Sequence, residues 1–405
     1  MSRPRILLLT TYYHPVLGGV ETNARRLAAF LHRQGFDVLV VTKRVRPGAP
    51  HEEVIDGVPV VRVPPAGERS PGGKWRMLPF AFLALLRLRA RYDLICCIDY
   101  RGIGLAALAA GRLLGRPVIV QAGTTGVLSC ANWNPALVRC RIAPAGRLAR
   151  WLKRPLSAAY RSATAFLCIS REIEREALES GVPPARVHYM PHSIDVAEFR
   201  PPLPGERDRI RAEEGWPAGR PICLFLGRLS LEKGVLDLVQ AWNLVDRPEA
   251  TLVVVGPDMP GHAWDAGPRA RDFVASHQLE DRVIFTGPRQ DTARLLRAAD
   301  IFVQPSHFEA FGISVIEAMA TGLAVVASRV GGMRDYLSDE DNALFAPPED
   351  PAGLAAPLRR LIDDAGLRGR LAAAARATVE RSFDEAVVFG RTADLFVALA
   401  AGGGR

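Results

Sequence analysis

The sequence is poor in cysteine and in long apolar runs. Its six cysteines are scattered without a C-x2-C pair, so neither a disulfide framework nor a zinc motif is predicted. We expect the cysteines within apolar runs to be buried thiols of a reducing compartment, namely Cys96, Cys97, Cys168 and Cys223. The first apolar run is too short for a signal peptide, and the apolar part of residues 74–92 is too short to span a bilayer. A cytoplasmic protein is therefore expected, either free or peripheral on the inner face of the membrane.

One stretch lacks acidic residues. Residues 139–161 contain seven Lys and Arg and no Asp or Glu. Leu148, Trp151, Leu152 and Leu156 fall on one side of a helix predicted from about residue 145. A basic amphipathic segment with a tryptophan is typical of contact with an anionic membrane. The alternative is a solvated basic helix whose apolar stripe packs on the core. Residues 74–92 leave a similar choice between a core helix and an interfacial one.

Length and composition are those of a soluble two-domain protein. The chain has 405 residues, 48% hydrophobic and 23% charged, enough for two full-sized cores. The net charge of +9 is uneven, because residues 1–200 carry +15 and the remainder carries −6. This asymmetry indicates that the first half meets an anionic partner, although an arginine-rich genomic bias is the alternative. No nucleic-acid partner is predicted.

Apolar runs alternate with helical segments along the whole chain. The runs are bounded by Gly, Pro or polar residues, which predicts parallel strands covered on both faces. We predict an α/β fold of two doubly wound domains. Their expected bounds are residues 1–195 and 221–385, with a hinge or linker over residues 196–220. Residues 386–405 are expected to form a helix and tail that pack back on the first domain.

Residues 300–332 are the most informative stretch. They read as strand, loop, helix and strand, with Glu309 in the loop and Glu317 inside the helix. The N-terminus of a helix attracts anions such as a diphosphate. Glu317, farther along the helix, suits ribose hydroxyls, whereas Glu309 in the loop suits a sugar. The alternative for a bare Glu-x7-Glu pattern is two solvated surface glutamates.

Two other loops carry similar chemistry. Gly18 and Gly19 lie between the first strand and the first helix, where glycine permits close approach to a diphosphate. Arg228 and Lys233 follow the first strand of the second domain, and both side chains can bind phosphate. The alternative for these cations is a plain surface position. His14 is either a catalytic residue or a structural loop histidine, and the structural role is preferred.

Several strings together resemble one family. Residues 305–328 read PSxxExFGxxxxEAMAxGxxVxAS, residues 227–234 read GRLxxEKG, residues 15–21 read PxxGGxE, and residues 191–201 resemble the hinge pattern PNGVDxxxFxP. The chain resembles the GT4 retaining glycosyltransferases, which have the GT-B fold of two Rossmann-like domains facing a cleft. The resemblance implies transfer of a hexosyl group from a nucleoside-diphosphate sugar to an acceptor hydroxyl, in cell-envelope polysaccharide, glycolipid or other glycoconjugate synthesis. The catalytic residues implied are Arg228, Lys233 and Glu309. The donor-binding residues implied are Gly18, Gly19, Arg228, Lys233, Arg289, Glu309, Ala310, Phe311, Gly312, Ile313 and Glu317.

The resemblance fails at one point. Many members of the family place a histidine after the strand at residues 117–120, whereas this chain has Gln121, Ala122 and Gly123. A non-catalytic protein that binds sugar nucleotides is therefore the alternative function. The D-x-D pattern of Asp339 and Asp341 is interpreted as a loop coincidence. Neither a metal nor a cofactor is expected, and the residues do not identify the sugar, the base or the acceptor.

Overall fold

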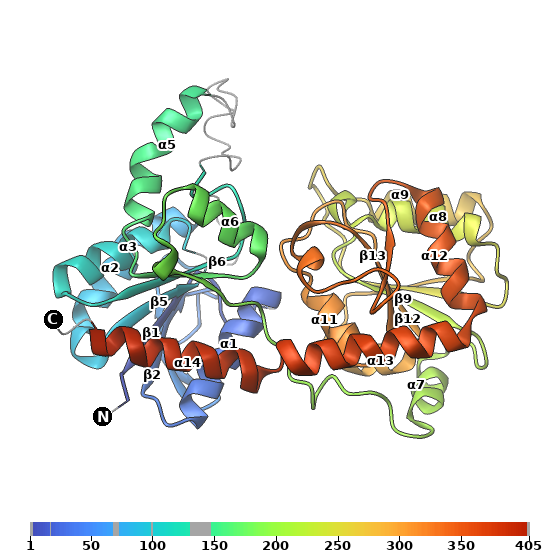
Figure 1. Cartoon of the computed structure of the whole chain (residues 1–405), viewed down its shortest axis with the longest axis horizontal. Helices are drawn as coiled ribbons and strands as arrows, with labels where there is room; N and C mark the ends of the chain where they lie inside the picture. Colours follow the sequence, from blue (N-terminus) through green and yellow to red (C-terminus); the bar gives the residue numbers. More distant parts are fainter. Residues whose placement is uncertain (1–2, 17, 68–72, 99, 130–146, 403–405) are drawn as a thin grey trace. The chain divides into compact units, whose positions relative to one another are not determined.

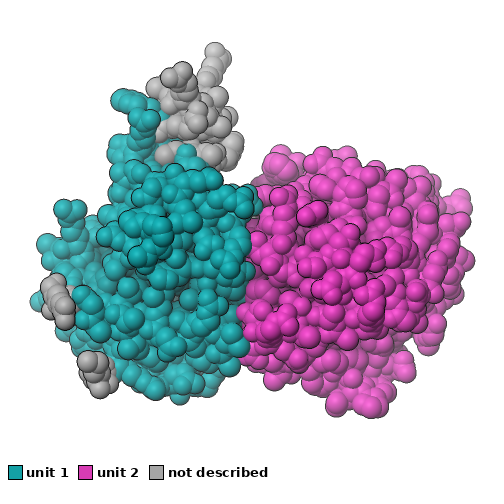
Figure 2. Space-filling model, in the orientation of Figure 1, with its two compact units in different colours: residues 1–193, 386–405 teal, residues 194–385 magenta. Residues whose placement is uncertain are grey.

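The chain folds into two compact units. The computed structural model describes residues 3–16, 18–67, 73–98, 100–129 and 147–402. Unit 1 comprises residues 1–193 and 386–405, and unit 2 comprises residues 194–385 (Figures 1 and 2). Each unit has its own twisted sheet and its own hydrophobic core, so the prediction of two α/β domains is confirmed.

Unit 1 is built on a sheet with strand order β3-β4-β2-β1-β5-β6-β7-β8. All neighbouring strands are parallel except β3 and β4, which form an antiparallel edge hairpin that the sequence analysis did not predict. The central strands are completely buried, as their uninterrupted apolar sequences require. The strands are β1 (Ile6–Thr10), β2 (Val38–Lys43), β3 (Glu52–Ile55), β4 (Val58–Val63), β5 (Leu94–Ile98), β6 (Val118–Ala122), β7 (Ala165–Cys168) and β8 (Val187–Tyr189).

Helices cover both faces of this sheet. Ile6 and Leu8 of β1 share a core with α1 (Gly19–Arg33) and α14 (Glu385–Gly402). The opposite face is covered by α2 (Gly73–Arg87) and α3 (Ile103–Leu114), which pack against each other (Figure 1). The remaining helices are α5 (Arg147–Tyr160), which contacts α3, and α6 (Arg171–Glu179). Short 3-10 turns occur at η1 (Arg89–Arg91) and η2 (Pro184–Arg186).

Unit 2 has an all-parallel sheet with strand order β11-β10-β9-β12-β13-β14. The strands are β9 (Ile222–Leu226), β10 (Thr251–Val255), β11 (Val283–Gly287), β12 (Ile301–Gln304), β13 (Ala324–Ser328) and β14 (Leu344–Ala346). The helices are α7 (Glu206–Glu214), α8 (Val235–Val245), α9 (Gly267–Ser276), α10 (Thr292–Ala298), α11 (Ile313–Ala320), α12 (Pro351–Asp363) and α13 (Ala365–Ser382). Two 3-10 turns, η3 (Leu231–Lys233) and η4 (Gly331–Asp335), lie in loops that follow strands.

The expected linker at residues 196–220 is a folded part of unit 2. Helix α7 packs against α10, and Arg211 donates to Asp300 at 2.6 Å. Asp300 also accepts a bond from the backbone N–H of Ile222 at 2.8 Å. The prolines that flank this stretch suggested a linker, but buried ion pairs with the sheet order it.

The cysteines behave as buried thiols. Cys96, Cys97, Cys168 and Cys223 are all buried. Burial in apolar surroundings raises the pKa of Cys96 and of Cys168 to about 12, so both stay protonated and inert. Among the helices that the structure describes, none has the length and apolarity needed to cross a bilayer.

Candidate active site

The loop after β12 is held by a buried polar network. The side-chain amide of Gln304 donates to Ser306 Oγ at 2.7 Å and accepts from Ser314 Oγ at 3.1 Å. Gln304 and Ser306 are almost inaccessible to solvent. One buried amide therefore connects the end of the strand to the start of the loop and to the first turn of α11. Buried polar groups that are fully paired hold a loop in a single conformation.

Helix α11 starts at a glycine that no other residue can replace without strain. Gly312 has a φ of +91°, and a Cβ there would lie 2.8 Å from Tyr336 Oη. The Tyr336 hydroxyl donates to the carbonyl oxygens of Phe311 and Gly312, at 2.8 and 3.2 Å. The chain consequently turns sharply into α11, and the N-terminus of this helix follows directly after the loop that carries Glu309.

Glu309 lies against two other loops. Its carbonyl oxygen accepts from the Gly332 N–H at 3.2 Å, and a Cβ on Gly331 would lie only 1.7 Å from the same oxygen. Its carboxylate Oε2 lies 2.5 Å from Lys233 Nζ. The two side chains are only 13% and 16% exposed. A solvated surface position for Glu309 and Lys233 is thus wrong, because they form a partly buried ion pair.

Sheet order explains why Glu309 and Lys233 meet. Strand β9 pairs directly with β12, with Cys223 opposite Ile301, so the loops that leave their carboxyl ends are neighbours. Gly234, with a φ of +70°, packs its backbone against Pro305. A Cβ on Gly234 would lie 2.0 Å from the Pro305 carbonyl oxygen. The His307 N–H donates to the Glu232 carbonyl at 2.9 Å. The two motifs that the sequence separates therefore form one surface at the carboxyl edge of the sheet.

Arg228 is the more accessible cation of this surface. Its side chain is 49% exposed and lies 3.7 Å from Glu232 in a loose i,i+4 pair. Such exposed pairs hold a guanidinium weakly. Arg228 can therefore turn toward an anion, whereas Lys233 is fixed beside Glu309.

At two of the predicted donor-binding positions, Arg289 and Phe311, the side chain contacts other residues of unit 2. The Arg289 guanidinium donates to Glu214 at 2.8 and 3.1 Å and to Asp291 at 2.9 and 2.7 Å. The ring of Phe311 is buried 5.4 Å from that of Tyr336 and 5.7 Å from that of Phe383. The side chains of Arg289 and Phe311 are thus engaged within unit 2, and the predicted donor contact would be made by their backbone groups.

The other predicted residues of unit 2 surround the start of α11. Ala310 and Ile313 are half-buried on either side of Gly312. Glu317 is half-buried in the second turn of the helix. These positions agree with the expected strand, loop and helix, which begins at Ile313 rather than at Gly312.

The predicted glycine pair lies in unit 1, at the start of α1. Gly18 is extended and Gly19 is the first helical residue. Nearby, the carboxyl ends of β1, β5 and β6 surround a cavity of about 100 Å³. Its lining is Thr10, Thr11, Tyr12, Val20, Glu21, Ile98, Arg101, Gln121, Gly123, Thr124 and His192. Gln121, found at the departure from the family pattern, thus faces this cavity.

Two histidines of unit 1 have different environments. His14 Nδ1 accepts from the Arg25 guanidinium at 3.3 Å, and the His14 carbonyl oxygen accepts from Arg62 at 2.6 Å. These contacts support the structural role. His192 lines the cavity and was not predicted, although its place in the hinge-like string, where the pattern has Asn, was a signal. Complete burial lowers the pKa of His192 to about 4, so the imidazole is neutral near pH 7.

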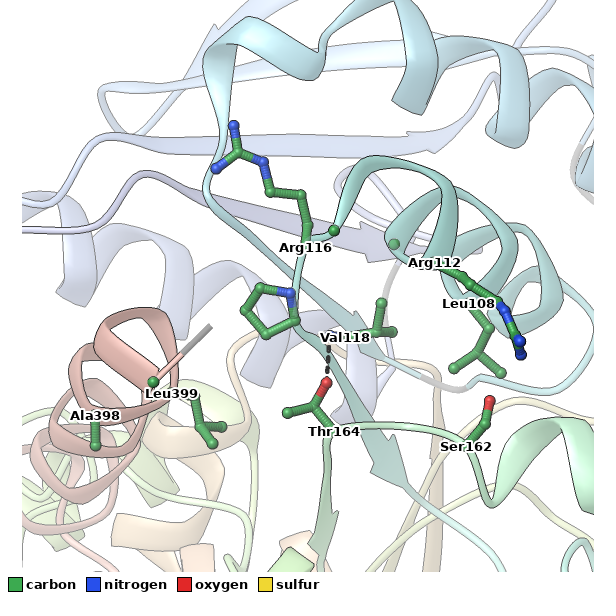
Figure 3. Close-up of a pocket in the computed structure, with 12 residues that line it drawn as sticks. Leu108, Arg112, Arg116, Val118, Ser162, Thr164, Ala398 and Leu399 are labelled. Carbon is green, nitrogen blue, oxygen red and sulfur yellow. Dashed lines mark hydrogen bonds between the residues drawn. The ribbon is translucent and has the colours of Figure 1, made fainter. Parts of the chain in front are cut away.

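A larger cavity lies at the opposite edge of the same sheet. It has a volume of about 540 Å³ and opens between the end of α3, the start of β6 and the end of α14 (Figure 3). Thr164 Oγ1, on its wall, accepts from the Val118 N–H at 3.0 Å. Ligands of doubly wound sheets bind at the carboxyl ends of the strands, so we assign the site to the other edge.

The D-x-D pattern has structural contacts. Asp339 Oδ1 accepts from the Phe345 N–H at 2.9 Å, and Glu340 binds Arg360 at 2.5 and 3.0 Å. Within the described parts of the chain, no cluster of three His, Cys, Asp or Glu side chains is arranged to hold a metal ion. The carboxylates of Asp339 and Glu340 thus have partners in the loop itself and in α12.

The fold and the two strand-end loops define the class of GT-B glycosyltransferases, and comparisons agree. Residues 206–378 match the family described as "Glycosyl transferases group 1", and residues 18–192 match "Glycosyl transferase 4-like domain". A D-inositol 3-phosphate glycosyltransferase of Xylanimonas cellulosilytica is 32% identical over 95% of this chain and 94% of its own. A 2-deoxystreptamine N-acetyl-D-glucosaminyltransferase of Streptomyces fradiae is 30% identical over 92% and 91%.

Solved structures show the same fold. Sucrose-phosphate synthase from Thermosynechococcus elongatus has a TM-score of 0.79 at 24% identity, over 98% of this chain and 100% of that one. Anabaena HepE, solved with UDP-glucose, has a TM-score of 0.75 at 21% identity, over 97% and 99%. The chain belongs to the GT4 family of glycosyltransferases.

Proposed function

We propose that this glycosyltransferase takes its sugar from a nucleoside-diphosphate donor and transfers it with retention of anomeric configuration. The observation that carries the proposal is the Lys233–Glu309 pair beside the N-terminus of α11. It places a cation, a hydrogen-bond acceptor and the positive end of a helix dipole in one loop cluster. A diphosphate with an attached sugar needs these three features together.

Each residue has a distinct proposed role. Lys233 neutralises Glu309, so an approaching diphosphate is not repelled, and Arg228 supplies a second, mobile cation. Both cations would stabilise the charge that develops on the leaving diphosphate. An ion-paired carboxylate is a poor nucleophile, which favours a sugar-positioning role for Glu309 over attack on the anomeric carbon. Glu317 would accept from ribose hydroxyls.

The acceptor side is proposed to lie in unit 1. Gly18 and Gly19 would contribute backbone N–H groups to the diphosphate, and the cavity at Gln121 and His192 offers amide and imidazole groups suited to hydroxyls. In this proposal the bound donor is shielded from water, which limits its hydrolysis. The acceptor would be a hydroxyl of a cell-envelope polysaccharide, glycolipid or other glycoconjugate. The transferred group would be a hexosyl.

We propose that no metal takes part, because cationic side chains and a helix N-terminus would meet the charge of the diphosphate. We also propose a cytoplasmic protein that makes peripheral contact with anionic membrane. In the described part of residues 139–161, Trp151 is 61% exposed and Arg154 is exposed, which supports such contact. Residues 139–146 and the side chains of Leu148 and Leu152 lie outside the described residues.

A donor panel tests the function. UDP- and GDP-sugars are first screened by thermal shift, since a ligand of the folded state raises Tm. Nucleotide release is then measured with and without candidate acceptors, and each reaction is repeated with EDTA. We expect stabilisation by one donor class and acceptor-dependent release that EDTA does not abolish. Stabilisation by a donor without nucleotide release for any acceptor favours the alternative, a non-catalytic protein that binds sugar nucleotides. This alternative is considered because Gln121 stands where many family members have a histidine. Loss of activity that Mg²⁺ or Mn²⁺ restores contradicts metal independence.

A further inference from the structure

The outward side of α2 carries large apolar side chains exposed to solvent. Trp75, Phe80 and Leu83 are 51%, 41% and 48% exposed. They share the helix surface with exposed Arg76, Pro79 and Arg87; these six residues are called the outer face of α2. The opposite side of the helix is a normal core face, where Met77, Ala81 and Leu85 are completely buried. Apolar residues thus lie on both sides of the helix, and only one side is covered by unit 1.

The helices on this side of unit 1 contain no acidic residue. Neither α2, α3 nor α5 includes an Asp or a Glu, and none occurs between Asp99 and Glu172. Arg89 and Arg91 follow α2 directly and are exposed. Helix α3 packs on α2 and contributes exposed Leu113 beside Arg112. The outer face of α2 therefore combines large exposed apolar side chains with arginines, on a helix that neither carries an acidic residue itself nor packs on a helix, α3, that does.

This combination fits one kind of partner. Aromatic and aliphatic side chains flanked by arginines match the boundary between headgroups and acyl chains, where anionic lipids attract the cations and the apolar groups leave water. A contact with the same face of a second copy brings like charges together and is repelled. Duplex nucleic acid matches the arginines, but its paired bases are not available to bury Trp75, Phe80 and Leu83.

We propose that the outer face of α2 docks this enzyme on the surface of a bilayer that contains anionic phospholipid. Trp75, Phe80 and Leu83 enter the headgroup region, and Arg76 and Arg87 bind lipid phosphates. The proposal builds on the peripheral membrane contact suggested above but places its centre on α2 rather than on residues 139–161. It rests on the proposed function only for the idea that the acceptor is carried by a membrane.

Co-sedimentation with vesicles tests the proposal. The full chain is mixed with vesicles of phosphatidylcholine alone or of phosphatidylcholine with phosphatidylglycerol, at low and physiological salt. Binding is expected only to the mixed vesicles and is expected to weaken with salt. The variant Phe80→Ser/Leu83→Ser is expected to lose at least about tenfold in vesicle affinity, because interfacial binding scales with the apolar area buried.

Matched variants separate this face from other surfaces. Trp264→Ala removes a tryptophan of unit 2 that is 52% exposed, and it should bind vesicles like the wild type, whereas Trp75→Ala should not. Equal binding by wild type and Phe80→Ser/Leu83→Ser overturns the proposal. So does loss of binding confined to Trp151→Ala, which would place the contact on α5. Absence of binding to any vesicle, or binding only to an added DNA duplex, overturns it as well.

The donor assay keeps the two proposals distinguishable. Phe80→Ser/Leu83→Ser should keep the wild-type Tm and the wild-type thermal shift with the donor, since both side chains are exposed and far in sequence from the donor loops. A donor response without vesicle binding refutes the docking face alone. Vesicle binding without any donor response refutes the proposed function and leaves the docking face in place.

Discussion

At the scale of single residues, the pairing of Lys233 with Glu309 decides what each can do. A partly buried pair leaves an uncompensated charge when one partner is removed. In the proposed function Lys233 would have two effects, since it neutralises Glu309 and would also present charge to an arriving anion. Arg228, which is half exposed, would have only the second effect.

We expect Arg228→Ala and Lys233→Ala each to lower kcat/KM tenfold to thousandfold. The reason is loss of a charge-assisted contact to the leaving diphosphate, about 2–4 kcal/mol in the transition state. Steady-state kinetics measure the effect, with Arg209→Ala as control because Arg209 makes an exposed i,i+4 pair in the same unit. Unchanged rates in both variants would contradict the assignment.

The two glutamates are expected to separate in binding and transfer. Glu317→Gln should weaken binding of the free nucleoside diphosphate, because the proposed ribose contact exists in donor and product alike. Glu309→Gln should lower turnover more than it lowers that affinity, because its proposed contact is with the sugar. Calorimetric titration with UDP or GDP, combined with kinetics, distinguishes them. The reverse pattern would exchange the two roles.

His192 makes the stability of unit 1 sensitive to acid. Its folded-state pKa of about 4 lies below the ordinary value of 6.5, so the unfolded chain binds the proton first as pH falls. The contribution of neutral His192 to the free energy of unfolding is fully present above pH 6.5 and is lost as the pH falls toward 4. The loss is roughly 2 kcal/mol at pH 5. We expect His192→Asn to lose less stability than the wild type between pH 7 and pH 5. The free energy of unfolding is measured for both proteins at pH 7 and pH 5. Comparing the change between the two pH values removes any loss of packing that does not depend on pH. Equal changes in wild type and variant would contradict the prediction.

At the scale of elements, the loop after β12 and helix α11 behave as one unit. The Gln304 amide fixes the start of the loop, and Gly312 fixes the turn into the helix. Tyr336 from η4 closes the arrangement by bonding both carbonyl oxygens at the turn. The geometry of the site thus depends on residues that do not themselves face a ligand.

Gly312→Ala is expected to destabilise unit 2 and to weaken nucleotide binding together. An alanine at positive φ costs about 1 kcal/mol, and the clash with Tyr336 Oη adds to it. Gly322→Ala is the matched control, because its φ is +76° but its Cβ meets nothing closer than 3.4 Å. Thermal unfolding and UDP titration should show loss of affinity for Gly312→Ala only. Equal losses of affinity would show that the turn does not shape the site.

At the scale of the whole molecule, the chain ends in the unit where it began. Helix α14 leaves unit 2 and completes the core of unit 1, where Phe396 is completely buried and the Phe389 ring lies 5.5 Å from that of Phe30. Unit 1 therefore cannot complete its core until α14 has been made. This arrangement links the folding of the two ends of the chain.

Phe396→Ala is expected to destabilise unit 1 by about 3–5 kcal/mol, the usual cost of emptying a buried aromatic site. Val397→Ala, its exposed neighbour, should change stability by less than about 0.5 kcal/mol. Hydrogen exchange followed unit by unit measures both, and protection in unit 2 should be unchanged. Equal protection of unit 1 in both variants would show that α14 adds little to its core.

The sequence by itself determined the elements and the class of protein. Continuous apolar runs predicted parallel strands, Glu309 before a predicted helix indicated a sugar-binding loop, and Arg228 and Lys233 after a predicted strand indicated a diphosphate-binding loop. These features are local, since they depend on spacing within one strand, turn or helix. The family resemblance rested on the same local strings, and the comparisons confirmed it.

Only the tertiary structure decided which side chains meet and which remain exposed. The order of strands β9 and β12 brings Lys233 to Glu309, 76 residues away, while Glu214 takes the guanidinium of Arg289. Burial of the Phe311 ring, the ordering of residues 196–220 and the exposed apolar side of α2 likewise depend on neighbours distant in sequence. The physical reason is that the residues next to an apolar or charged side chain in the sequence do not determine its partner. Tertiary packing therefore decides whether the side chain lies in the core, in an ion pair or on the surface.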